Sequence, residues 1–129
     1  MLGNVTGFHF IVAEDNPQDR FLIEHHLSTS CPWAHISAFE NAEDALAHYQ
    51  RHGADLVITD HSMPGMTGAD LVDILRKLNP RLPIIMVSSS PFAREDGLAA
   101  GVDEFLGKDQ LAECLPKILL GLLGRKIGQ

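Results

Sequence analysis

A chain of 129 residues in which 45% of the side chains are hydrophobic suits one domain with a single core. We therefore expect one domain over residues 1–129, with an ordered core at 7–123. The net charge of −7 is spread along the sequence without a Lys/Arg-rich run, which argues against direct nucleic-acid binding. With neither a signal peptide nor an apolar run of about 20 residues, we expect a cytoplasmic protein without membrane insertion.

Short apolar or β-branched runs alternate along the chain with longer stretches in which apolar residues recur at helical spacing. The runs predict five strands, at residues 8–13, 35–39, 56–59, 84–88 and 104–106. The third and fourth runs are the most continuously apolar, so we expect them to be central and buried on both faces. The alternation predicts an α/β fold with one open parallel sheet, and right-handed crossovers then place helices on both of its faces.

Capping residues mark where the intervening helices begin and end. The predicted N-caps are Asn16, Asn41 and Ser90. The predicted ends are Gly53, Asn79 and Gly101.

The last helix contains a proline inside its apolar pattern. Because Pro116 cannot donate the backbone hydrogen bond of a helix interior, this helix is expected to start late or to kink there. Residues 124–129 are predicted to be a fraying tail.

Chemically useful side chains follow four of the predicted strands. Glu14 and Asp15 follow the first, Asp60 the third, Ser88 ends the fourth, and Lys108 comes soon after the fifth. Ligands of open α/β sheets bind beyond the carboxyl ends of the strands, so we expect these residues to converge.

Three carboxylates in one place repel one another, so either some of them stay protonated or a cation lies among them, and a divalent cation is the simpler answer. An oxygen-only ligand set favours Mg²⁺ or Mn²⁺ over zinc and leaves coordination positions for phosphate oxygens. The site is therefore predicted to perform phosphoryl transfer, with Asp60 as the carboxylate nucleophile, while Lys108 and Ser88 contact equatorial oxygens.

The order of these motifs resembles the response-regulator receiver family. The motifs are Glu14-Asp15, Asp60 within TDHSMPGMTG, Ser88 after PIIMV and Lys108 after EFLG. The resemblance covers nearly the whole chain and implies a flavodoxin-like fold with strand order 2-1-3-4-5 and five helices on two faces.

The resemblance also implies the roles of the site residues. Asp60 would accept a phosphoryl group from a phosphohistidine donor, a histidine kinase or phosphotransfer protein, in a self-catalysed reaction followed by autodephosphorylation. Asp15, Asp60 and the backbone carbonyl of Ser62 would bind the metal directly, and Glu14 would act partly through water.

A conformational switch is part of the same expectation. Ser88 would turn toward the phosphoryl group, and Phe105 would swing inward to fill the vacated space. That motion would remodel the face made by the fourth helix, fifth strand and fifth helix, where a downstream protein partner is expected to bind. Ser62 and Ser90 flank the site and are expected to influence access of water.

Two residues depart from the family pattern. Phe105 stands where tyrosine is more frequent, so the hydrogen bond of a phenol is absent. Asp109 replaces the usual proline after Lys108. A trans Lys108–Asp109 peptide bond is predicted, because a cis bond before a non-proline residue costs about 2.5–4 kcal/mol. Asp109 is also expected to cap the last helix and to compete for the Lys108 ammonium.

Seven histidines raise the alternative of a second metal site. His48 and His52 lie one helical turn apart, but no third ligand is evident. His25 and His26 point about 100° apart around their helix and do not converge. His61 follows Asp60 and is expected at the rim of the site.

Two other functions fit the sequence less well than the receiver function. An aspartyl-nucleophile phosphatase needs a second Asp two residues after the nucleophile, where Ser62 stands. A flavodoxin-like electron carrier needs a hydroxyl-rich phosphate loop, where Glu14 and Asp15 would repel the phosphate. A phosphorelay intermediate and the receiver segment of a hybrid histidine kinase remain open alternatives.

Overall fold

A computed structural model describes residues 7–127 of the chain, and within that range five strands alternate with five α-helices. In chain order, the elements are β1 (His9–Ala13), α1 (Pro17–Ser30), β2 (His35–Phe39), α2 (Ala42–His52), β3 (Leu56–Asp60), α3 (Gly68–Leu78), β4 (Ile84–Ser88), α4 (Ala93–Ala100), β5 (Glu104–Gly107), the 3₁₀ turn η2 (Lys108–Gln110) and α5 (Leu111–Ile127).

The strands form one sheet in the order β2-β1-β3-β4-β5, and every neighbouring pair is parallel. This confirms the predicted fold class and strand order. All residues of β3 and β4 are buried, as their apolar sequences predicted. The order reverses between β1 and β3, so the carboxyl ends of these two strands form the switch point at which open α/β sheets bind ligands.

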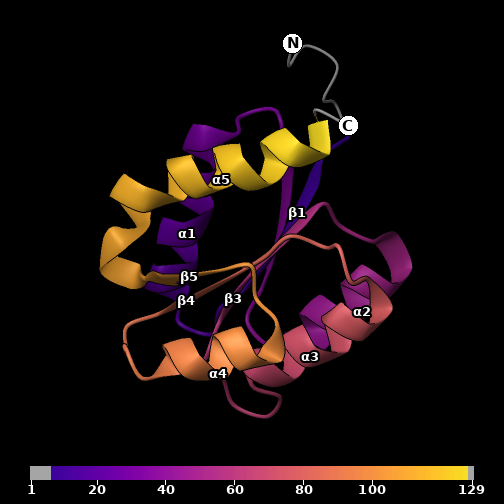
Figure 1. The fold of residues 1–129 in the computed structure, drawn as a ribbon, viewed down its shortest axis with the longest axis vertical. Coiled ribbons are helices and arrows are strands. Elements are labelled where there is room, and N and C mark those ends of the chain that lie inside the picture. The colour runs from indigo at the N-terminus through magenta and orange to yellow at the C-terminus, as the bar shows by residue number, and fades with distance from the viewer. Residues whose placement is uncertain (1–6, 128–129) are drawn as a thin grey trace.

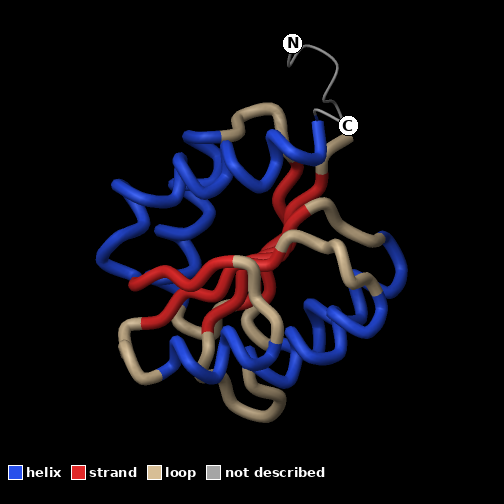
Figure 2. Tube along the Cα trace, in the orientation of Figure 1, coloured by secondary structure: helices blue, strands red, loops and turns tan. Residues whose placement is uncertain are grey.

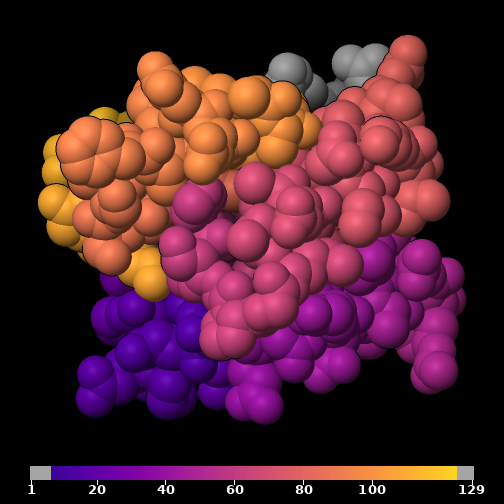
Figure 3. Space-filling model, turned by 90° about the horizontal axis from the view of Figure 1, so that it is seen from below, coloured from indigo at the N-terminus to yellow at the C-terminus, as the bar shows by residue number. Residues whose placement is uncertain are grey.

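The sheet lies between two layers of helices (Figure 1, Figure 2). Helices α1 and α5 cover one face, and α2, α3 and α4 cover the other, where they lie side by side (Figure 3). Successive strand residues point to opposite faces, so Phe10 and Val12 pack beneath α1 and α5, while Ile11 and Ala13 pack beneath α2 and α3. Two apolar cores result, one on each side of the sheet.

Two predicted N-caps are confirmed. Asn16 Oδ1 accepts a hydrogen bond from the Asp19 amide at 2.9 Å, and Asn41 Oδ1 accepts one from Asp44 at 2.7 Å. Helix α3 begins with a capping box in which Thr67 and Asp70 each accept a hydrogen bond from the other's amide.

The prediction that Ser90 caps the fourth helix is wrong. Helix α4 begins at Ala93, and its N-cap residue Phe92 makes no side-chain capping bond. Ser90 instead closes a turn before the helix: its hydroxyl accepts a hydrogen bond from the Phe92 amide, and its carbonyl accepts one from Ala93. A serine side chain serves turns and caps equally well, and Pro91 holds the turn here.

The expectation of a late start for the last helix is also wrong. Helix α5 begins at Leu111, five residues before Pro116, and it continues to Ile127. The predicted tail from Gly124 is therefore helical up to residue 127, and residues 128–129 lie outside the described residues. The residues of this helix that are buried against α1 and the sheet are Leu111, Leu115, Leu119, Leu122 and Leu123. Burial of one such side chain stabilises by about 1.5–3 kcal/mol, so together they exceed the roughly 3 kcal/mol cost of an interior proline.

None of the helices in the described part of the chain is long and apolar enough to cross a membrane.

Candidate functional site

The carboxyl ends of β1 and β3 bring three acidic side chains together. One carboxylate oxygen from each of Glu14, Asp15 and Asp60 lies within 4.8 Å of the others. Glu14 is fully buried and Asp60 is 6% exposed, whereas Asp15 faces solvent. The predicted acidic cluster therefore forms, with two carboxylates inside and one at the rim.

Local hydrogen bonds hold Asp60 at the end of β3. The His61 amide donates to Asp60 Oδ1 at 2.9 Å, and the Thr59 hydroxyl donates to the Asp60 carbonyl at 2.9 Å. Asp60 also pairs with Val87 of β4, which extends the buried strand up to the carboxylate itself. The first bond holds the Asp60 side chain, and the second holds its main-chain carbonyl.

The glycines of the MPGMTG segment have separate structural reasons. A Cβ on Gly68 would lie 1.9 Å from the Asp60 carbonyl oxygen, so only glycine lets α3 begin this close to β3. Gly65 has a φ of +80°, which a side chain would strain. Glu43 of α2 secures this loop by accepting a hydrogen bond from the Met66 amide at 3.0 Å.

Lys108 reaches into the cluster from η2. Its Nζ lies 2.8 Å from Glu14 Oε1, 2.8 Å from Asp19 Oδ2 and 3.6 Å from Asp60 Oδ1. The Lys108–Asp109 peptide bond is trans, as predicted, since the described residues contain no cis bond. The acid that competes for the ammonium is Asp19, and the prediction of Asp109 in that role is wrong.

Sequence reasoning missed Asp19 as part of the site. Asp19 lies in the first turn of α1, where its backbone amide donates a hydrogen bond to the Asn16 side chain that caps the helix. Its carboxylate accepts a hydrogen bond from the Lys108 ammonium, at 2.8 Å. The available signal was position: Asp19 follows Asp15 by four residues, at the helix start that faces the same sheet edge.

The proximity of these groups changes their protonation. Burial raises the pKa of Glu14 to about 7, against the opposing effect of Lys108. Burial also raises the pKa of Asp60, which Lys108 partly offsets. Burial alone would lower the pKa of Lys108, but contacts with Asp19 and Glu14 raise it above its ordinary value.

Glu14 has one oxygen without a hydrogen bond. The Asn16 amide donates to Oε2 at 3.2 Å, whereas Oε1 accepts no hydrogen bond from the described residues. Oε1 lies 2.8 Å from the Lys108 Nζ, with which it forms an ion pair. A buried carboxylate oxygen in this condition is a natural cation ligand.

Ser88 and Phe105 lie beside the acidic cluster and not inside it. The Ser88 hydroxyl accepts a hydrogen bond from the Ser90 amide at 3.0 Å, which turns it toward the β4–α4 loop. Phe105 is half-buried and packs against the apolar core beneath α2 and α3. Ser88, Ser90 and Phe105 line one hollow of about 390 Å³ together with Arg94 of α4.

His61 connects the loop after β3 to α4. Its Nε2 lies 3.1 Å from Asp96 Oδ2, and its Nδ1 lies 3.1 Å from the Ser62 hydroxyl. Ser62 itself is exposed next to this contact. His61 therefore lies near the rim, where it links the loop after β3 to α4, one element of the expected switch.

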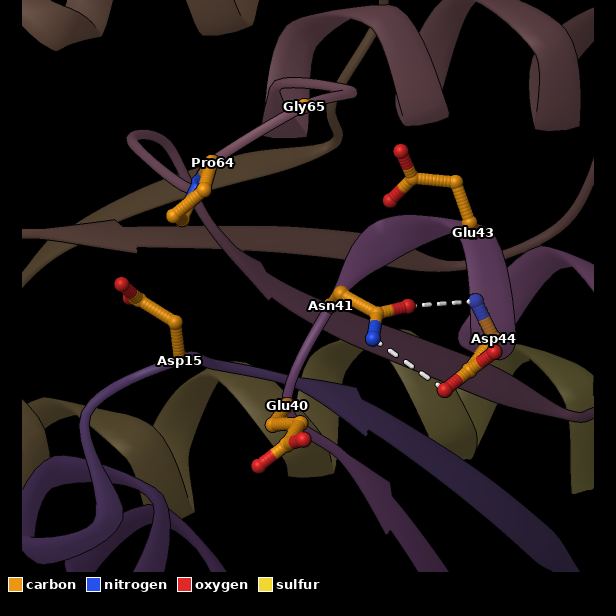
Figure 4. Close-up of a pocket in the computed structure, with 7 residues that line it drawn as sticks. All are labelled: Asp15, Glu40, Asn41, Glu43, Asp44, Pro64 and Gly65. Atoms are coloured by element: carbon orange, nitrogen blue, oxygen red, sulfur yellow. Dashed lines mark hydrogen bonds between the residues drawn. The ribbon is translucent and has the colours of Figure 1, made fainter.

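An acidic hollow of about 660 Å³ opens beside Asp15 (Figure 4). Glu43 and Asp44 line it from the start of α2, and Glu40 lines it from the turn between β2 and α2. Pro64 and Gly65 of the loop after β3 lie opposite (Figure 4). Asn41 holds Asp44 through two hydrogen bonds, of 2.7 and 3.1 Å. This concentration of negative charge favours cations and repels anions that approach the site without one.

Comparison with known proteins finds one matching family model. The model for the response regulator receiver domain matches residues 10–119. The two-component response regulator PhoP of Pseudomonas aeruginosa is 34% identical over 86% of this chain and 51% of its own length. The transcriptional regulatory protein TctD of Salmonella typhimurium is 31% identical over 92% of this chain and 53% of its own length. The chain thus spans about half the length of these relatives.

Solved structures share the same fold. A response regulator receiver domain protein from Clostridium thermocellum superposes with a TM-score of 0.81, at 21% identity, over 92% of this chain and 96% of its own. The chemotaxis protein CheY4 of Vibrio cholerae superposes with a TM-score of 0.72, at 27% identity, over 92% of this chain and 97% of its own. The relay, hybrid-kinase and phosphatase alternatives are not favoured by these matches.

Proposed function

The chain belongs to the response regulator receiver domain family, and from that premise we propose that Asp60 is its phosphoacceptor. The observation that carries the assignment is the position of Asp60. It is a nearly buried carboxylate at the carboxyl end of a central strand, 3.6 Å from the Lys108 ammonium and beside two further carboxylates. Glu14 is deeper and paired with Lys108, and Asp15 is exposed.

The proposed reaction is transfer of a phosphoryl group from a phosphohistidine. A carboxylate oxygen of Asp60 attacks phosphorus, the P–N bond breaks, and the imidazole nitrogen leaves with the electron pair and then takes a proton. The donor is a histidine kinase or a phosphotransfer protein. Hydrolysis of the acyl phosphate by water returns Asp60 to a carboxylate and releases inorganic phosphate.

The acidic cluster fits Mg²⁺ or Mn²⁺. All three of its side chains offer oxygen, and Glu14 Oε1 is a buried acceptor without a hydrogen bond from the described residues. Asp15, Asp60 and the Ser62 carbonyl would hold the ion, with Glu14 acting partly through water. When bound, the ion would supply positive charge to the phosphoryl oxygens.

Lys108 and Ser88 would contact the transferred phosphoryl group. The ammonium is already directed at Asp60, but Asp19 and Glu14 hold it at 2.8 Å each, so it must loosen at least one contact. The Ser88 hydroxyl must give up the hydrogen bond that it accepts from the Ser90 amide and turn toward the phosphoryl group. Phe105 would then move inward, and the face of α4, β5 and α5 would change toward a protein partner.

A small-molecule phosphodonor tests the assignment. Acetyl phosphate with Mg²⁺ should add one phosphoryl group to the wild type, detected by intact mass, and Asp60→Asn should abolish this. Asp73→Asn is the matched control, because Asp73 is an exposed carboxylate of α3 paired with Lys77. Labelling that persists in Asp60→Asn, or that proceeds unchanged in EDTA, would contradict the proposal.

A further inference from the structure

Four histidines from three elements meet at the amino end of the sheet. His9 begins β1, His35 begins β2, and His48 and His52 lie in the last turns of α2. The ring centroids are 5.0 Å apart for His9 and His35, 5.1 Å for His9 and His48, and 4.6 Å for His48 and His52. The sequence paired only the last two, and the β1–β2 register supplies the others by placing His9 opposite His35.

Two of these rings already lie at a metal-binding separation. His9 Nε2 and His48 Nε2 are 3.3 Å apart and share a hydrogen bond, which a bound metal would replace. Two zinc–nitrogen bonds of about 2.0–2.1 Å at a tetrahedral angle place their nitrogens roughly 3.3–3.4 Å apart. The observed distance therefore equals one edge of a tetrahedral site.

The surroundings suit an ion that enters from solvent. The strand holds His9 through a hydrogen bond from its backbone amide to Asp55 Oδ2, at 2.9 Å. His35 and His52 are exposed, so their rings are free to reorient. The Ser37 hydroxyl lies 2.9 Å from His9 Nε2, and a metal would take the lone pair that this hydroxyl can use.

Both rings of the close pair favour the neutral form, which is the ligand form of imidazole. Burial lowers the pKa of His9, and His35 and His48 lower it further. Burial also lowers the pKa of His48, with His52 and His35 adding to the effect.

We propose that His9 and His48 bind a Zn²⁺ ion whose coordination is completed by the exposed rings of His52 and His35. Imidazole ligands select borderline ions such as Zn²⁺, whereas the carboxylates around Asp60 suit Mg²⁺. The five residue steps from His9 to Glu14 separate the two sites by about 16 Å along β1. This second site is independent of phosphorylation at Asp60.

The test is a Zn²⁺ titration of the full, reduced chain by calorimetry, with excess Mg²⁺ present to occupy the acidic cluster. The wild type should bind one ion. His9→Gln and His48→Gln should each weaken binding by at least about tenfold, since each removes one of the two rings already at a binding separation. His35→Gln and His52→Gln also remove a ligand each, but they should weaken binding less, because these exposed rings must first reorient to bind. The matched control is His25→Gln on α1, whose ring stacks on Phe21 outside the cluster and should leave affinity unchanged.

NMR of the histidine rings gives a second readout that does not depend on a variant folding. Zn²⁺ should shift the ring resonances of the four clustered histidines and leave those of His25 and His26 in place. Failure to bind Zn²⁺ would overturn the proposal. So would equal affinity in the wild type and His48→Gln, or shifts confined to residues near Asp60 or Cys114.

Discussion

Lys108 is held closer to Asp19 than to Asp60, with Nζ–oxygen distances of 2.8 Å and 3.6 Å. The ammonium proposed to stabilise the phosphoryl group is therefore partly engaged by an acid from another element. Asp19 lies on the first turn of α1, so its carboxylate links this helix to the turn after β5.

Asp19→Asn should increase the rate of phosphorylation by acetyl phosphate. This half-exposed ion pair contributes about 0.2–1 kcal/mol to holding Lys108 away from Asp60. Its loss would lower the activation free energy by that amount, which corresponds to a rate increase of roughly 1.4- to 5-fold. The measurement is the initial rate of phosphorylation, followed by intact mass. Glu113→Gln, which removes an exposed charge on α5, is the control and should leave the rate unchanged. A slower Asp19→Asn would mean that Asp19 positions Lys108 productively.

The stability of the metal-free protein should depend on Glu14 between pH 4.5 and 7. Its pKa is raised from 4.5 to about 7 by burial, so in this window the unfolded chain releases a proton that the folded state keeps. Its contribution to the free energy of unfolding is therefore fully present below pH 4.5. As the pH rises to 7, on the order of 3 kcal/mol of that stability is lost. Asp60, whose pKa is also raised, acts in the same direction.

Glu14→Gln separates the pH dependence due to Glu14 from that due to the histidines. The lowered pKa values of His9 and His48 make the free energy of unfolding rise with pH, which is the opposite direction. In urea denaturation with EDTA, the variant should match the wild type near pH 4.5 and exceed its free energy of unfolding at pH 8. Added Mg²⁺ should narrow the gap by stabilising the wild type. A variant that is less stable at pH 8 would show that the Lys108 ion pair outweighs burial.

Gly68→Ala should destabilise the fold at the site. The new Cβ would meet the Asp60 carbonyl oxygen at 1.9 Å, and this backbone atom cannot move without disturbing β3. Overpacking of this kind costs about 1–3 kcal/mol. Gly121→Ala on α5 is the matched control, because its Cβ would enter open space and should stabilise the helix by up to about 1 kcal/mol. Equal free energies of unfolding for the two variants would disprove the close-contact argument.

Beryllium fluoride, a phosphoryl mimic, should shift NMR resonances well beyond Asp60. With Mg²⁺ present, we expect changes at Phe105 and along α4, because the Ser88 hydroxyl must leave the Ser90 amide. To change the ratio of switched to unswitched conformation from 1:99 to 99:1, the mimic must stabilise the switched conformation by about 5.5 kcal/mol relative to the other. Asp60→Asn should show none of these changes. Shifts confined to the immediate neighbours of Asp60 in the wild type would contradict the switch.

The sequence predicted the elements that local patterns determine. The five apolar runs became the five strands, and Asn16 and Asn41 cap their helices because an Asn side chain reaches only the next turn. Ser90 failed as a cap because a turn used the same hydroxyl. The predicted late start of α5 was wrong because the burial of its leucines contributes more stability than an interior proline costs.

The site was predictable to the extent that topology fixes it. Parallel strands carry Glu14, Asp15 and Asp60 to one edge, so their convergence follows from the strand pattern. The Asp19–Lys108 contact joins residues 89 positions apart, and the orientation of a long side chain decides it. His9 and His35 likewise meet only through strand register, which the sequence does not state.

The missing side-chain cap of α4 has an energetic consequence. This helix has eight residues, and the two that are buried are Ala93 and Gly97. A glycine inside a helix costs about 1 kcal/mol of stability relative to alanine. Opening α4 locally would therefore expose little apolar area, so its amides should exchange with deuterium earlier than those of α3, which has a capping box and buried leucines. A segment with so small a free energy of local opening can be rearranged while the sheet and the other helices stay folded.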